Sequence, residues 1–98
     1  MSKKELIEQF GAVSSEVATA MAAGAREKSG ADFAAAVTGI AGPTGGTEQK
    51  PIGLVYIAIA SEKGVEAEKF LFGPRDRDFI RQRTYQNALN LLRLRLGV

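Results

Sequence analysis

The chain lacks two residue types that would point directly to a chemistry. It contains no cysteine and no histidine among its 98 residues. The absence of cysteine excludes disulfides and thiol chemistry, so redox compartment cannot be inferred from it. The absence of histidine removes the commonest metal ligand and the usual general base. Catalysis by this chain would therefore have to use other groups.

Long apolar runs and a strong excess of one charge are also missing. No apolar run reaches the length of about 18 residues that a membrane helix needs, and residues 1–5 lack the apolar segment of a signal peptide. We therefore expect a soluble, cytoplasmic protein without a membrane partner. The net charge is +2, too small to indicate nucleic-acid binding. With 45% hydrophobic and 24% charged residues, the composition is typical of one globular domain or part of one.

Apolar periodicity and capping residues predict the element order α-α-β-loop-β-β-α. The uninterrupted apolar stretch 52–60 predicts a central strand that is covered on both faces. The charged residues of 65–72 predict an edge strand, joined to it by a four-residue hairpin loop at 61–64. The other expected elements are a short helix from the Ser2 cap to Gly11, helices over 14–28 and 76–96, and a buried strand over 33–37.

The most informative stretch is VTGIAGPTGGT at residues 37–47, which leads from a strand into a glycine-rich loop. Glycine lets backbone N–H groups approach a ligand closely, and threonine adds hydroxyl groups. The pattern indicates a cradle for a phosphate or carbonyl oxygen. It is neither a Walker loop nor a dinucleotide fingerprint, because no Gly-Lys-Ser/Thr follows and the next element is a strand. The alternative is an ordinary surface turn.

Arg77 and Arg81 form a second candidate site at the start of the last helix. Arginines four residues apart share a helix face and could hold a phosphate with paired N–H donors. The helix N-terminus would favour the same anion. The alternative is a solvated basic face that pairs with Asp76 and Asp78.

No nucleophile with an activating base can be assembled from these residues. The loop threonines have no histidine beside them, and a lysine base has no assigned position. Lys50 is most simply an exposed lysine, and Tyr56 and Tyr85 are most simply packing residues. The residues alone therefore indicate a ligand-binding α/β domain whose catalytic group is not identified.

Four stretches together resemble one known family. Residues 11–18, GAVSSEVA, resemble its "GAVSEEVA" segment, and residues 37–47 resemble "VTGIAGPxGGT". Residues 50–58, KPIGLVYIA, resemble "KPVGTVYIA", and residues 72–81 resemble "FxGDRxxVR". These segments are similar to the C-terminal domain of competence/damage-inducible protein A, the CinA family of nicotinamide-nucleotide amidases. The resemblance covers nearly the whole chain.

The resemblance implies a three-layer α/β/α sandwich with a small mixed sheet, of which residues 1–98 form a partial domain. It also implies hydrolysis of nicotinamide mononucleotide to nicotinic acid mononucleotide and ammonia, without metal or cofactor. The family's catalytic serine and lysine lie in "ESCTGG" and "YSNxxK" segments, and neither occurs in this chain. We therefore expect no catalytic residue here, and an inactive fragment.

The family motifs place the substrate-binding residues on the glycine loop and the last helix. Arg77 is preferred to Arg75 as the family arginine because it keeps the four-residue step to Arg81. The expected substrate-binding set is Thr38, Gly39, Ile40, Ala41, Gly42, Arg77 and Arg81.

The expected partners follow from the same comparison. Nicotinamide mononucleotide is expected as the ligand, and the chain is expected as a homo-oligomer or bound to the absent N-terminal part of the domain. Nucleic acid is not expected, because no stacking aromatics alternate with the arginines of the last helix. The alternative function is a non-catalytic nucleotide-binding or protein-interaction module.

Overall fold

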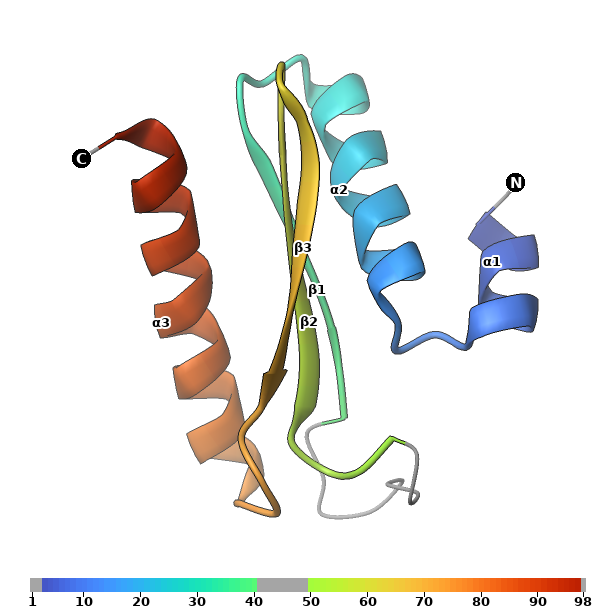
Figure 1. Ribbon diagram of the computed structural model, residues 1–98, viewed down its shortest axis with the longest axis vertical. Coiled ribbons are helices and arrows are strands. Elements are labelled where there is room, and N and C mark those ends of the chain that lie inside the picture. Colours follow the sequence, from blue (N-terminus) through green and yellow to red (C-terminus); the bar gives the residue numbers. More distant parts are fainter. Residues whose placement is uncertain (1–2, 41–49, 98) are drawn as a thin grey trace.

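The computed structural model describes residues 3–40 and 50–97, which form three helices and three strands. Figure 1 shows the sheet edge-on, with α3 on one side and α1 and α2 on the other. The predicted three-layer α/β/α arrangement is therefore confirmed. In chain order the elements are α1 (Lys3–Phe10), α2 (Ser15–Ser29), β1 (Ala34–Gly39), β2 (Leu54–Ser61), β3 (Gly64–Leu71) and α3 (Arg77–Leu96).

The sheet has the order β1-β2-β3, and both pairings are antiparallel. A mixed sheet was expected, but no parallel pair occurs among the strands described. The reason is that the chain reverses direction between successive neighbouring strands. Ser61 pairs with Gly64, so the hairpin turn has two residues rather than the expected four. The central place of β2 and the edge place of β3 are confirmed.

β2 begins at Leu54, two residues later than the sequence predicts, because Gly53 forms a turn. Gly53 has φ +92°, and its N–H donates to the Ile40 carbonyl oxygen at 2.7 Å. A Cβ at this position would overlap the backbone of Gly73. The apolar stretch that starts at residue 52 therefore includes a turn before the strand, and position 53 of this turn accommodates only glycine.

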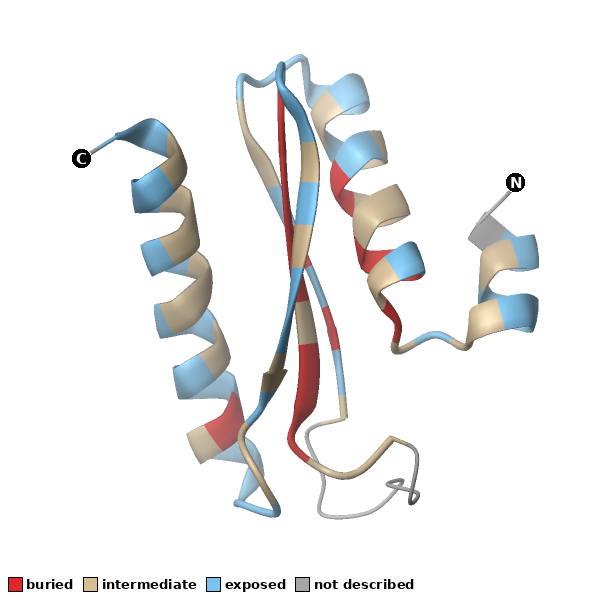
Figure 2. Ribbon diagram, viewed as in Figure 1, coloured by how far each residue is buried: buried red, intermediate tan, exposed pale blue. Residues whose placement is uncertain are grey.

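The two faces of the sheet have cores of different composition. The face toward α2 is built from alanines, including Ala22 on the helix and Ala58 on the sheet. The face toward α3 is built from larger groups, including Ile57 and Ile80. Figure 2 shows the buried residues concentrated on β2 and on the sheet side of α2. The small alanine side chains let α2 pack closely against the sheet.

Side chains cap the helices where the sequence predicts. The Ser14 hydroxyl accepts from the Val17 N–H at 3.2 Å at the start of α2, and Gly30 ends this helix in the left-handed region. The Asp76 carboxylate accepts from the Phe79 N–H at 2.8 Å and so starts α3. The expected Ser2 cap lies outside the described residues.

Candidate functional site

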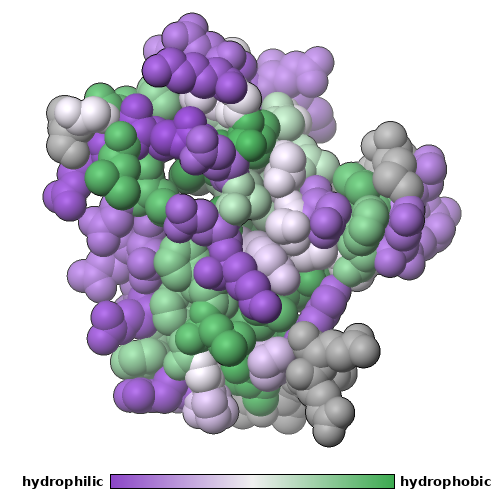
Figure 3. All heavy atoms as spheres, in the orientation of Figure 1, coloured by the Kyte–Doolittle hydropathy of each residue, from purple (hydrophilic) through white to green (hydrophobic). Residues whose placement is uncertain are grey.

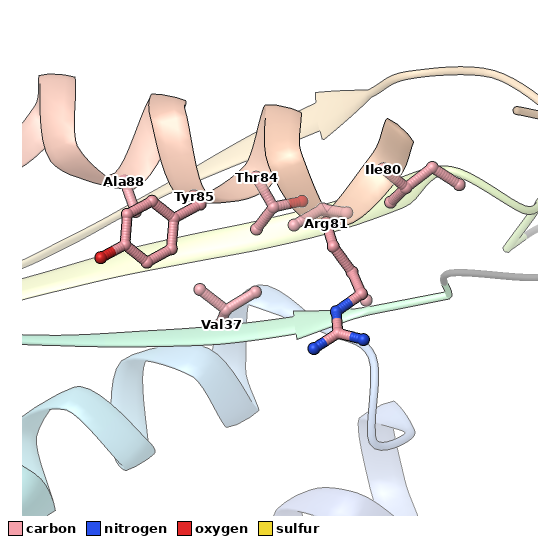
Figure 4. Close-up of a pocket in the computed structure, with 8 residues that line it drawn as sticks. Val37, Ile80, Arg81, Thr84, Tyr85 and Ala88 are labelled. Carbon is pink, nitrogen blue, oxygen red and sulfur yellow. The ribbon is translucent and has the colours of Figure 1, made fainter. Parts of the chain in front are cut away.

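A pocket of about 310 Å³ lies between the sheet and the first half of α3. β1 and β2 form one wall of it, and α3 forms the other (Figure 4). The pocket brings together residues that are far apart in the sequence. It is lined by Val37, Gly39, Val55, Ile80, Arg81, Thr84, Tyr85 and Ala88.

The two ends of the pocket differ in chemistry. At one end the Arg81 guanidinium reaches toward the end of β1, as Figure 4 shows. At the other end Val37, Tyr85 and Ala88 present apolar surface. Arg81 is the one charged residue among the described residues of the lining. An anion would be held at the arginine end and an apolar group at the other.

The local sequence of α3 fixes the position of Arg81. The Asp76 cap sets where the helix begins, and Ile80, which is 2% exposed, anchors its first turn in the core. Thr84, Tyr85 and Ala88 follow Arg81 by three, four and seven residues, so they share its helix face. One face of α3 therefore forms one wall of the pocket.

Gly39 has a structural reason to be glycine. A Cβ added to it would lie 2.9 Å from Val55 Cγ2 and 3.3 Å from the Leu54 carbonyl oxygen. The neighbouring strand therefore occupies the space that a side chain would need. As a result, the backbone of Gly39 itself forms part of the pocket wall.

Two predicted site residues at the end of β1 lie outside the pocket. Thr38 is buried on the α2 face of the sheet, where its hydroxyl donates to the Ser14 carbonyl oxygen at 3.4 Å. Ile40 donates its N–H to the Leu54 carbonyl oxygen at 2.9 Å. These contacts tie the end of β1 to α2 and to β2. Ala41 and Gly42 lie outside the described residues.

The arginines around the start of α3 lie in three different settings, of which the pocket holds Arg81. The guanidinium groups of Arg75 and Arg83 lie over the Phe79 ring, at 4.0 and 5.2 Å from its centre. Arg77 is exposed on the first residue of the helix and does not line the pocket. Of the predicted set within the described residues, the structure brings Gly39 and Arg81 together in one pocket.

Sequence reasoning missed Thr84 and Tyr85. Tyr85 was interpreted as a packing residue, but it is 69% exposed at the pocket. Their helical spacing from Arg81 was the available signal. The expectation of an exposed Lys50 was also wrong, since this half-buried residue donates to the Phe10 carbonyl oxygen at 2.6 Å. Tyr56 packs against the alanine core as expected.

Within residues 3–40 and 50–97, no helix is both long and apolar enough to cross a membrane. No cluster of three or more metal-ligating side chains occurs in the same ranges.

Comparison with known proteins gives one consistent result. A model of the CinA C-terminal domain matches residues 2–96. A CinA-like protein of Geotalea uraniireducens is 54% identical over 93 residues, and one of Synechococcus sp. (strain RCC307) is 52% identical over 93 residues. These matches cover 95% and 94% of this chain but 22% of each relative. The chain thus spans about a fifth of these curated relatives.

Solved structures match the fold closely. The competence/damage inducible protein CihA of Agrobacterium tumefaciens is 46% identical with a TM-score of 0.87, and the match covers 90% of this chain and 54% of that one. A CinA superfamily protein of Escherichia coli is 34% identical with a TM-score of 0.84, covering 93% of this chain and 53% of that one. The chain spans about half of each solved relative.

Proposed function

The chain belongs to the CinA C-terminal domain family, and from this premise we propose that it supplies the substrate-holding part of a nicotinamide-nucleotide amidase site. The substrate would be nicotinamide mononucleotide, with nicotinic acid mononucleotide and ammonia as products. The observation that carries the proposal is the meeting of Gly39 and Arg81 in one pocket.

The arginine end of the pocket suits the phosphate of a mononucleotide. A guanidinium offers fixed N–H donors that match phosphate oxygens, and it keeps its charge at any physiological pH. Among the described residues that line the pocket, none carries a carboxylate that would compete for Arg81. Arg77, one helical turn earlier, adds positive charge nearby. We therefore assign phosphate binding to Arg81, with Arg77 in support.

The bond-breaking step belongs to groups outside these 98 residues. In acyl transfer, a serine oxygen attacks the carboxamide carbon, a base takes the serine proton, and ammonia leaves with a proton. Water then releases the acid and restores the serine. The chain contains neither of the two motifs that carry the family's serine and lysine. The proposal therefore makes the chain inactive by itself.

An ammonia-release assay tests this function. The purified chain is incubated with nicotinamide mononucleotide, alone and after co-expression with a segment that carries "ESCTGG" and "YSNxxK". We expect no turnover by the chain alone and ammonia release by the complemented protein. Enzyme-like turnover by the chain alone contradicts the proposed inactivity, and inactivity of a correctly assembled complex contradicts the amidase assignment.

A matched pair of arginine variants tests the site. Arg81→Ala should weaken binding of the mononucleotide to the complemented protein by about 10-fold or more, as expected for loss of a charge-assisted contact. Arg83→Ala removes the same charge two residues away, where the guanidinium lies on Phe79, and should have little effect. Equal losses in both variants would contradict the assignment of Arg81.

A further inference from the structure

The connection between α1 and α2 is held by side chains from two distant segments. The Thr38 hydroxyl, on β1, donates to the Ser14 carbonyl oxygen at 3.4 Å. The Lys50 ammonium, shortly before β2, donates to the Phe10 carbonyl oxygen at 2.6 Å. Figure 3 shows α1 projecting from the side of the molecule, with hydrophilic side chains on its outer surface. These two hydrogen bonds therefore help to determine how the projecting helix is attached.

Lys50 supplies a charge that α1 itself lacks. α1 has 8 residues and no basic residue in its last turn. The final carbonyl groups of a helix have no partner within the helix, and the helix dipole favours a positive charge beside them. The half-buried Lys50, 40 residues after Phe10 in the chain, places its ammonium there. The lysine therefore stabilises the end of a helix to which it does not belong.

Gly11 leaves the space that this ammonium occupies. Its φ is +85°, in the left-handed region, and a Cβ at this position would overlap the Lys50 ammonium. The Gly11 carbonyl oxygen also accepts from the Ser14 hydroxyl at 3.0 Å. The contact between Lys50 and the end of α1 therefore depends on the absence of a side chain at position 11.

Lys50 also begins a turn that is bonded toward both walls of the pocket. The Gly53 N–H donates to the Ile40 carbonyl oxygen at 2.7 Å, at the end of β1. The Gly53 carbonyl oxygen accepts from the Phe72 N–H at 2.9 Å, in the segment between β3 and α3. β1 contributes to one wall of the pocket, and α3 forms the other. The turn at 50–54 therefore links the end of α1 to both walls.

We propose that Lys50 is a positioning residue for this pocket, an inference that rests on the proposed function. Its ammonium holds the turn at 50–54 against the end of α1, so that Gly39 and Arg81 keep the separation at which they hold the mononucleotide. Lys50 is not among the described residues that line the pocket. It therefore acts on the ligand through the backbone and not by contact.

A comparison of KM with kcat in the complemented protein tests this role. Lys50→Met removes the charge but keeps a long side chain. It should raise the KM for nicotinamide mononucleotide by about 5-fold or more and leave kcat within about 2-fold, because a displaced wall weakens substrate and transition-state binding alike. Lys50→Arg keeps the charge and should recover part of the loss.

Lys63→Met is the matched control for loss of charge. Lys63 is exposed in the hairpin turn between β2 and β3, so its replacement should change neither KM nor kcat. An unchanged KM in Lys50→Met, or an equal rise in the control, overturns the proposal.

Glycine variants test the position of the ammonium separately from its charge. Gly11→Ala should displace the Lys50 ammonium and raise the KM, and the same change should add little in the Lys50→Met background. Gly30→Ala is the control for backbone strain, since Gly30 has φ +69° and nothing within 4 Å of an added Cβ. This control should leave the KM unchanged. Fully additive effects of Gly11→Ala and Lys50→Met overturn the proposal.

Hydrogen exchange in the chain itself distinguishes failure of this inference from failure of the proposed function. Lys50→Met should accelerate exchange of the Gly53 amide, because the turn is held less firmly, while the amides of α2 keep their rates. Circular dichroism confirms that each variant is folded. Absence of turnover by the unsubstituted complemented protein contradicts the amidase proposal, and the exchange result then decides the role of Lys50. Unchanged exchange at Gly53 overturns that role.

Discussion

At the scale of single residues, two glycines differ in whether the fold has space for a side chain at their position. Gly24 lies in the middle of α2, and a Cβ there would meet nothing within 4 Å. Gly53 has a positive φ and lies against the backbone of Gly73. We predict that Gly24→Ala raises the free energy of unfolding by about 0.5–1 kcal/mol, and that Gly53→Ala lowers it by about 1–3 kcal/mol from backbone strain, with the overlap in addition. Urea denaturation measures both, and equal effects would contradict this account.

At the scale of elements, α3 depends on its first turn. Its N-terminus is capped by Asp76, and Ile80 is its fully buried residue in the part of the chain described. Asp76→Ala should lower the free energy of unfolding by about 1 kcal/mol, because it leaves a helix N–H without its partner. Asp76→Asn keeps a capping oxygen and serves as the control. Thermal melts of the two variants check the prediction, which fails if they lose the same stability.

At the scale of the whole molecule, the two helical layers are attached unequally. α2 buries Val17, Ala18 and Ala22 against the sheet, whereas α3 buries Ile80 alone among its described residues. We predict that amides of α3 exchange faster than those of α2 in the isolated chain, because fewer apolar contacts oppose local opening. Hydrogen exchange followed by mass spectrometry checks this, and equal protection of both helices would contradict it.

The burial of Ile80 gives a further prediction for the core between α3 and the sheet. Ile80→Ala removes a side chain that is 2% exposed, which typically costs about 2–5 kcal/mol. Its effect should concentrate in α3, so that exchange there accelerates while α2 keeps its protection. Met21→Ala, on the opposite face of the sheet, is the comparison and should spare α3. Uniform acceleration through both helices would show that the two layers unfold together.

Local patterns were sufficient for most of the fold. The apolar run of β2 indicated a strand covered on both faces, and the charges of β3 indicated an edge, because each pattern reports burial directly. The starts of α2 and α3 could also be predicted, because helix capping involves residues within four positions of one another. The glycine-loop and arginine motifs also supported the family that the comparisons then established.

What the tertiary structure decided depends on residues distant in the chain. Gly39 and Arg81 share a pocket because α3 packs on the face of the sheet that Gly39 of β1 helps to form, and no local pattern records that contact. Thr38 belongs to the same motif as Gly39. Its side chain nevertheless points toward α2, because successive side chains of a strand point to opposite faces of the sheet. The antiparallel sheet likewise follows from strand order. The sequence by itself determined the elements and the family, whereas the packing of those elements determined which side chains can act together.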